Sequence, residues 1–194
     1  MKNNRGKLVI LSAPSGAGKT TICKNLLSIN EDWKYSISAT TRPMRENEVD
    51  GDDYHFLSKE KFEHKERFGE FIECEWVHGN RYGTPVQPLE DALDNGNIFL
   101  LDVDVKGAMN LIEEFEEDCI SIFIEPPGIN VQEKIESLNE RLLKRGGSNE
   151  TLIKQRLKRF ELELSYKEKF SFSFINEDLD ETTDEINNKI KENL

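Results

Sequence analysis

Apolar residues gather in four short, nearly continuous runs along the chain. The runs cover residues 7–12, 97–103, 119–125 and 171–176. Continuous apolar character without alternation is typical of strands that are covered on both faces, as in a parallel sheet. A fifth run, at residues 35–40, is more polar and becomes β-branched at its end, and we expect it to form a shorter strand.

Stretches with helical periodicity separate these runs. We expect helices over residues 19–29, 86–95, 129–144, 150–169 and 184–194. The second of them stops at an Asn-Gly pair, which is a common helix end. Strand and helix alternate, so the pattern predicts an α/β fold in which helices flank a parallel sheet joined by right-handed crossovers.

Two segments interrupt this alternation. Residues 39–86 combine many charges with aromatic side chains and the turn signals Asp50-Gly51 and Gly79-Asn80, which indicates a small, mixed, β-rich insertion. Residues 129–169 read as two helices around a Gly-Gly-Ser turn, which indicates a movable helical lid. The expected organisation is one domain whose core comprises residues 1–37, 88–128 and 168–194, with an insertion at 38–87 and a lid at 129–167.

The net charge and the length of the apolar runs indicate which kinds of partner the protein can bind. The chain has 194 residues, and its 38 acidic against 26 basic residues give a net charge of −12. Non-specific nucleic-acid binding needs a basic face, so no nucleic-acid partner is expected, although a local positive site can still hold a phosphorylated small molecule. The longest apolar runs fall far short of the roughly 20 residues that span a bilayer, so no membrane partner is expected either.

Cysteine usage bears on location. Cys23, Cys74 and Cys119 are far apart and form no CxxC pair. Reduced thiols in a cytoplasmic protein are the simplest interpretation. The sequence leaves a monomer and a homo-oligomer both open.

The strongest chemical signal is a glycine-rich segment between the first strand and the first helix. Residues 11–21 read Leu-Ser-Ala-Pro-Ser-Gly-Ala-Gly-Lys-Thr-Thr. Glycines let backbone N–H groups turn inward around a phosphate, and the helix N-terminus adds partial positive charge. Lys19 would reach the β and γ phosphates of ATP, and the Thr20 hydroxyl would ligate Mg²⁺. The predicted ATP-binding residues are Ala13, Pro14, Ser15, Gly16, Ala17, Gly18, Lys19, Thr20 and Thr21.

The match to the phosphate-loop pattern G-x-x-x-x-G-K-[ST] departs at one position. Ala13 stands where the first glycine belongs, and alanine suffices there if its φ stays negative. The alternative is an ordinary glycine-rich turn between a strand and a helix. We call residues 13–20 the P-loop below.

Two carboxylates follow the second apolar run. In an open α/β sheet, ligands bind outside the carboxyl ends of the strands. Asp102 ends its strand and is therefore expected to face Mg²⁺, through water, beside Thr20. Asp104 lies two residues further on and shares its face if the strand continues. Alternatively, both are plain turn residues.

Several further segments closely resemble the signature of guanylate kinases. They are residues 36–56, which include Thr-Thr-Arg-Pro-Met-Arg, and residues 71–73, 79–84, 101–107 and 176–178. The matches run in order from the P-loop and cover nearly the whole chain. The resemblance implies Mg²⁺-dependent transfer of a phosphoryl group from ATP to GMP, and to dGMP.

The resemblance also implies a GMP site in the insertion. Arginines can fork onto a phosphate while tyrosine hydroxyls add donors. Buried carboxylates can accept from the ring N–H and the amine of guanine, and adenine would leave them unpaired. Taken singly, each of these residues would more often be an ordinary surface or turn residue. The implied GMP-binding residues are Ser38, Arg42, Arg45, Tyr54, Glu73, Tyr82, Thr84 and Asp104.

Positive charge in this acidic chain is concentrated in the predicted lid. Residues 141–159 hold seven basic side chains against the single acid Glu150. By resemblance, Arg141, Arg145 and Arg156 join Lys19 as catalytic residues that neutralise the transferring phosphoryl group. A solvated helix face with local salt bridges is the alternative. The resemblance further places Asn176 in the adenine pocket.

The sequence therefore favours a nucleoside monophosphate kinase with ATP and GMP as its partners. The attacking phosphate oxygen of GMP is already anionic at neutral pH, so no essential general base is expected. Two alternatives stay open at this point. One is a kinase of the same architecture that acts on another phosphorylated acceptor, and the other is a non-catalytic module that binds phosphopeptides.

Overall fold

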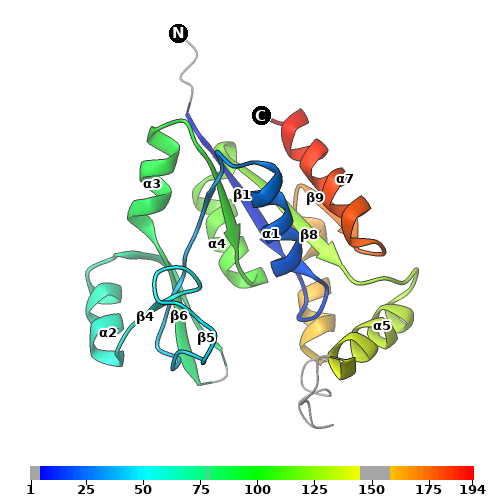
Figure 1. Ribbon diagram of the computed structural model, residues 1–194, viewed down its shortest axis with the longest axis horizontal. Coiled ribbons are helices and arrows are strands. Elements are labelled where there is room, and N and C mark those ends of the chain that lie inside the picture. The colour runs from blue at the N-terminus through cyan, green and yellow to red at the C-terminus, as the bar shows by residue number, and fades with distance from the viewer. Residues whose placement is uncertain (1–4, 78, 145–157) are drawn as a thin grey trace.

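A five-stranded parallel sheet forms the centre of the molecule. The computed structural model describes residues 5–77, 79–144 and 158–194. The sheet has the order β2-β7-β1-β8-β9, with β1 in the middle (Figure 1). Its strands are β1 (Lys7–Ser12), β2 (Lys34–Tyr35), β7 (Ile98–Asp102), β8 (Cys119–Glu125) and β9 (Phe172–Ile175).

Helices cover both faces of this sheet, and the alternation of side chains along β1 explains why. Val9 and Leu11 point into one fully buried cluster, which also includes residues of α1 (Lys19–Ile29) and α7 (Leu179–Glu192). Leu8 and Ile10 point into a second cluster on the opposite face. That second cluster is closed by α3 (Val86–Asp94) and α4 (Val105–Glu114).

A smaller mixed sheet lies at one end of the core. Its order is β4-β3-β6-β5, built from β3 (Ala39–Thr40), β4 (His55–Phe56), β5 (Phe71–Val77) and β6 (Asn80–Pro85). β3 pairs in parallel with β4, whereas the β3–β6 and β5–β6 pairs are antiparallel. The helix α2 (Lys59–Arg67) buries Phe62 completely, and its ring stacks on Phe71 with 4.6 Å between centroids.

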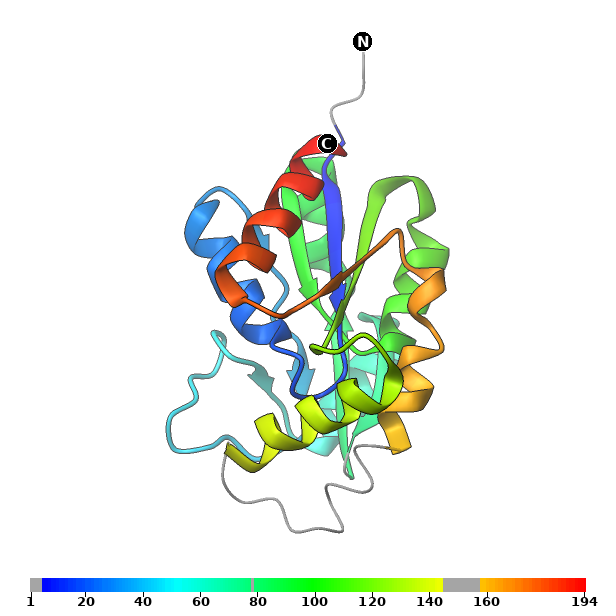
Figure 2. The same ribbon diagram turned by 90° about the vertical axis from the view of Figure 1, so that its right-hand side faces the viewer.

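The region between β8 and β9 is mainly helical where it is described. It contains α5 (Val131–Lys144), a helical segment at residues 158–164 and the short 3₁₀ turn Lys167–Lys169. Another 3₁₀ turn, Glu116–Asp118, precedes β8. Figure 2 shows α5 lying beside the loop that joins β1 to α1. No described helix combines the length and the apolar character needed to cross a membrane.

The structure confirms the predicted fold class, an α/β fold with a parallel core, helices on both sides and a second mixed sheet. The four apolar runs correspond to β1, β7, β8 and β9 within one or two residues. Residues 19–29 form the expected helix. The helices expected at 86–95 and 129–144 end and begin within two residues of α3 and α5.

One strand prediction was wrong. Residues 35–40 do not form a single strand, because the chain leaves the core sheet after Tyr35 and joins the second sheet at Ala39. The former residue pairs with Leu100 of β7 and the latter with Gly83 of β6. The residues between Tyr35 and Ala39 are polar and have no hydrophobic periodicity, so the sequence does not show where the chain passes from one sheet to the other.

Helix predictions were also incomplete. The sequence did not predict α2 or α4, each of which begins at a side-chain cap, Ser58 and Asp104 respectively. The last helix begins at Leu179 rather than at residue 184, because the Asp178 carboxylate accepts from two N–H groups of its first turn. Of the helix expected at 150–169, residues 158–164 are helical, and residues 150–157, like the Gly-Gly-Ser turn, lie outside the described part of the chain.

We expect Leu100→Ala to lower the free energy of unfolding by about 3 kcal/mol, because it empties a completely buried position between β1 and β2. Urea unfolding measures this change. Ile29→Ala is the control, since Ile29 is 48% exposed and its loss should cost about 0.5 kcal/mol or less. Equal losses in the two variants would contradict the placement of the core.

Candidate functional site

The P-loop connects the central strand to α1 in a conformation that depends on two glycines. Gly16 and Gly18 have φ values of 99° and 100°, a region that side chains disfavour. The N–H of Ala17 donates to the carbonyl of Pro14 at 3.0 Å and closes the turn. Gly18 then starts α1, because its carbonyl accepts from the N–H groups of Thr21 and Ile22.

Asn176, the residue that follows β9, binds the backbone of the P-loop. Its amide nitrogen donates to the Ala17 carbonyl at 2.7 Å, and the side chain is almost fully buried. A Cβ at Gly18 would come within 2.3 Å of this nitrogen, so only glycine fits. The Oδ1 atom of Asn176 is buried and has no hydrogen-bond partner among the residues that the structure describes. An unsatisfied buried acceptor next to a glycine loop is a candidate ligand contact.

Lys19 and Thr20 both contact the carboxylate that ends β7. The Lys19 ammonium pairs with Asp102 Oδ1 and also donates to the Val103 carbonyl at 2.7 Å. Burial acts to lower the pKa of Lys19, but the charge of Asp102 and its hydrogen bond outweigh burial, so this pKa is raised and the side chain stays cationic. The Thr20 hydroxyl lies 3.4 Å from Asp102 Oδ2.

This pair of oxygen ligands fits a magnesium ion. Mg²⁺ prefers oxygen donors, keeps several waters and commonly shares its shell with phosphates. Among the described residues, no group of three or more His, Cys, Asp or Glu side chains could hold a metal without other ligands. Thr20 and Asp102 therefore suit a metal that arrives with a nucleotide.

A cleft of about 400 Å³ lies between the P-loop and the second sheet. The core contributes Pro14, Gly16, Lys19, Thr20 and Asp102 among others. The second sheet contributes Val77 and Tyr82, and the loop before β4 contributes Tyr54. A smaller cavity of about 170 Å³ shares part of this lining and adds Ser38, Glu73 and Glu75. Core and insertion residues thus line adjoining hollows, as a two-substrate site requires.

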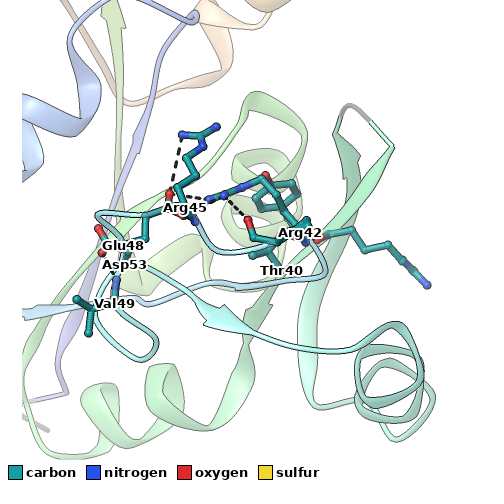
Figure 3. Close-up of polar contacts among 9 residues, drawn as sticks. Thr40, Arg42, Arg45, Glu48, Val49 and Asp53 are labelled. Atoms are coloured by element: carbon teal, nitrogen blue, oxygen red, sulfur yellow. Dashed lines mark hydrogen bonds and ion pairs between the residues drawn. The ribbon is translucent and has the colours of Figure 1, made fainter.

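The two arginines of the loop after β3 converge on one carboxylate. The terminal nitrogens of Arg42 donate to the two oxygens of Glu48 at 2.9 and 2.7 Å (Figure 3). Arg45 lies further away, with its guanidinium 3.9 Å from Glu48 and its side chain 75% exposed. The Nε of Arg42 also donates to the Tyr82 hydroxyl at 3.3 Å. A bidentate fork on a carboxylate has the geometry that suits a phosphate.

Two tyrosine rings pack beside the guanidinium of Arg42. The rings of Tyr54 and Tyr82 meet edge to face with centroids 5.8 Å apart. The guanidinium of Arg42 lies 5.4 Å from the centroid of Tyr54. The phenol groups and the guanidinium therefore form one connected unit in the insertion.

A half-buried carboxyl group lines the smaller cavity. Glu73, on β5, accepts from the Thr84 hydroxyl at 2.6 Å, and its carboxyl group packs closely against Gly107 of α4. Burial raises the pKa of Glu73 to about 7, although the Thr84 hydrogen bond acts in the opposite direction. Glu73 therefore changes its protonation state near neutral pH.

Asp104 has two roles in the structure. Its Oδ1 accepts from the N–H groups of Lys106 and Gly107 and caps α4. Its Oδ2 accepts from Arg159 at 2.9 Å, and Arg159 in turn pairs with Glu163 at 2.7 Å. The capping bonds hold the Asp104 carboxylate in place, and Asp104 lines both cavities.

Arg141 is the predicted catalytic arginine of α5 that the structure describes. Its guanidinium donates to the Asn176 carbonyl at 3.0 Å and lies 3.5 Å from the Ala17 carbonyl. It therefore lies against the P-loop. The other two predicted catalytic arginines, Arg145 and Arg156, fall outside the described residues.

The structure thus brings most of the predicted site residues to adjoining hollows, while Arg45 lies at an exposed edge. Sequence reasoning gave no role to Glu48, Arg159 or Glu163. Glu48 lies within the segment that resembles guanylate kinases, and Arg159 belongs to the basic cluster of the predicted lid, so local signals existed. No sequence signal pairs Arg159 with Asp104, which is 55 residues away.

Comparison with known proteins identifies relatives along the whole chain. The family model for guanylate kinase matches residues 5–193. The guanylate kinase of Chlorobium luteolum is 46% identical over 181 residues, which cover 93% of this chain and 89% of that protein. A guanylate kinase of Clostridium perfringens is 39% identical over 203 aligned positions, covering 100% of this chain and 91% of that protein.

Solved structures agree with the sequence comparison. The crystal structure of guanylate kinase from Anaplasma phagocytophilum has a TM-score of 0.78 and 35% sequence identity, covering 97% of this chain and 86% of that chain. A gluconokinase from Sinorhizobium meliloti has a TM-score of 0.51 at 14% identity, which shows a likeness of fold alone.

The raised pKa of Glu73 predicts a pH-dependent stability difference. Glu73 protonates near pH 7 in the folded protein and near 4.5 when unfolded. Its contribution is therefore fully present below about pH 4.5 and is lost as the pH rises through 7. Relative to Glu73→Gln, the native protein should lose up to about 3 kcal/mol of unfolding free energy between pH 4.5 and 8. Urea unfolding across this range tests it, and parallel profiles for the two proteins would contradict the burial of Glu73.

Proposed function

Because the chain belongs to the guanylate kinase family and transfers a phosphoryl group from ATP to GMP, we propose that this reaction takes place in the cleft between the P-loop and the second sheet. The observation that carries the proposal is the lining of that cleft. Lys19, Thr20 and Asp102 face it from the core, and Tyr54 and Tyr82 face it from the insertion. The P-loop and the second sheet thus line one cavity.

On the core side, we assign ATP to the P-loop. The backbone N–H groups of Ser15, Gly16 and Gly18 and the N-terminus of α1 would hold the phosphates, with Lys19 on the β and γ phosphates. Thr20 would hold Mg²⁺ directly and Asp102 through water, and the metal would neutralise phosphate charge during transfer. The unpaired Oδ1 of Asn176 supports an adenine contact, since it can accept from an exocyclic amine.

On the insertion side, we assign the phosphate of GMP to Arg42 and Arg45 with the hydroxyls of Tyr54 and Tyr82. The Arg42 fork already binds an oxyanion, the carboxylate of Glu48. GMP phosphate would take over that fork, so Glu48 must release it on binding. An exchange of one anion for another keeps the guanidinium paired throughout.

The guanine base is assigned to the smaller cavity. Ionised Glu73 and Asp104 would accept from the ring N–H and the exocyclic amine, and Ser38 and Thr84 add hydroxyl groups. Adenine offers an acceptor at N1 and would leave a buried carboxylate unpaired. Since recognition then rests on base and phosphate, we include dGMP as an acceptor.

The remaining chemistry is charge neutralisation and positioning. A GMP phosphate oxygen attacks the γ phosphorus of ATP, and the bond to the ADP oxygen breaks, so no general base is needed. Arg141, with Arg145 and Arg156, would neutralise the charge of the group in transfer. We propose that residues 38–87 act as the GMP-binding insertion and 129–167 as a lid over the core segments.

The site of action proposed is the cytoplasm. All three cysteines are free, with Cys23 buried against the core. Free thiols are usual in reducing compartments.

A panel of acceptors tests the function. With ATP and Mg²⁺, coupled assays should show high turnover with GMP and dGMP and very little with AMP, CMP and UMP. Glu73→Gln should lose at least about tenfold in GMP over AMP preference, because it removes a carboxylate acceptor, while ATP affinity stays unchanged. A preference for AMP would point to another acceptor class, and no turnover with any acceptor would favour a non-catalytic binding module.

We expect Lys19→Met to reduce kcat by about 10²–10³-fold, since it removes a cation from the transferring phosphates. Affinity for GMP should change little, because GMP binds on the insertion side. The matched control is Lys24→Met, an exposed lysine of the same helix. Stopped-time product assays and equilibrium titration with GMP measure the two quantities. Unchanged turnover in Lys19→Met would contradict the assignment of ATP to the P-loop.

A further inference from the structure

A buried carboxylate lies at the end of β8, outside the cleft. Glu125 has a relative exposure of 1%, and its two oxygens pair with two different lysines. Oε2 pairs with the Lys134 ammonium, and Oε1 accepts from Lys167 at 2.7 Å. Lys134 is itself 7% exposed. Burial of a carboxylate costs free energy unless the group is fully paired. A buried glutamate at the end of a largely apolar strand therefore suggests a specific role.

The two lysines come from opposite ends of the region between β8 and β9. Lys134 is in the first turn of α5, and Lys167 is in the 3₁₀ turn that leads to β9. One carboxylate therefore fastens both segments to the carboxyl end of the core sheet. The backbone carbonyl of Glu125 also accepts from the N–H of Asn176, the residue that supports the P-loop.

The face of α5 that carries Lys134 also carries Arg141. Lys134, Leu138 and Arg141 are spaced four and three residues apart, so they lie along one side of the helix. Leu138 is 2% exposed, which shows that this side faces the protein. Seven residues of helix span about 10.5 Å. Both ends of this side of α5 thus contact the core, through Lys134 on Glu125 and through Arg141 on the carbonyls of Asn176 and Ala17.

We propose that Glu125, acting through Lys134, is a positioning residue that sets the guanidinium of Arg141 against the P-loop. Glu125 fixes the start of α5 through its side chain and fixes Asn176 through its carbonyl, so one residue aligns Arg141 with the backbone that it contacts. The inference rests on the role that the proposed function gives to Arg141. Neither Glu125 nor Lys134 touches the cleft.

A double-mutant cycle separates positioning from a general effect on stability. Lys134→Met removes the contact to α5 yet leaves Glu125 paired with Lys167, so the protein should still fold. We expect it to lower kcat/KM for ATP about tenfold in the native background and less than about twofold in the Arg141→Met background, because a misplaced arginine matters only when the arginine is present. GMP affinity, measured by titration, should be unchanged in both.

Lys167→Met is the matched control. It removes the same charge from the same carboxylate but does not lie on the helix of Arg141, so its effect on kcat/KM should be the same factor in both backgrounds. Lys134→Arg, which keeps the charge, should restore most of the activity. Should Lys134→Met fail to fold by circular dichroism, Glu125→Asp takes its place, since it keeps the charge and withdraws it by one methylene, and the same dependence on Arg141 is expected.

The outcomes distinguish this inference from the function itself. If Arg141→Met impairs turnover and Lys134→Met costs the same factor in both backgrounds, or nothing in either, the positioning role is wrong and the proposed function stands. If Arg141→Met leaves turnover unchanged, the proposed role of Arg141 is wrong, and the inference falls with it.

Discussion

The parallel pairing of β1 with β7 is the constraint on which the site depends. It sets Leu11, just before the P-loop, beside Asp102, the last residue of β7. The loop that leaves β1 must then turn over the Asp102 carboxylate, where Lys19 and Thr20 meet it. Because both strands are buried on both faces, this register cannot slip without exposing a full row of apolar side chains.

Three charged pairs lie at or beside the cleft. Lys19 pairs with Asp102, Arg42 with Glu48, and Asp104 with Arg159. Each pair gives a partly buried charge at the cleft an opposite charge as its partner. In the proposed function, binding of nucleotides exchanges one partner for another. The free energy of binding is the difference between two sets of charge-assisted bonds, which favours selectivity over tight binding.

Glu125, with Lys134 and Lys167, also forms a set of internal charge pairs, but this set is more buried than those at the cleft. Its carboxylate has a side-chain exposure of 2%, whereas those of Glu48 and Asp104 are 15% and 24% exposed. The more open pairs can exchange with a substrate, while the closed one is confined to holding chain segments together. Burial therefore distinguishes the pairs to which we assign ligand contacts from the pair to which we assign a positioning role.

The sequence by itself determined the features that depend on neighbouring residues. The strands of the core follow from continuous apolar runs, and the P-loop follows from glycines and Lys19 within ten residues of one another. The resemblance to guanylate kinases supplied the residues of the insertion, and the roles given to Arg145 and Arg156 stay predictions. Only the tertiary structure decided that residues 35–40 divide between two sheets, that Arg159 meets Asp104, and that Glu125 collects Lys134 and Lys167. The physical reason is that such pairs join residues whose distance in space is set by strand order and helix docking, and periodicity along a chain carries no record of either.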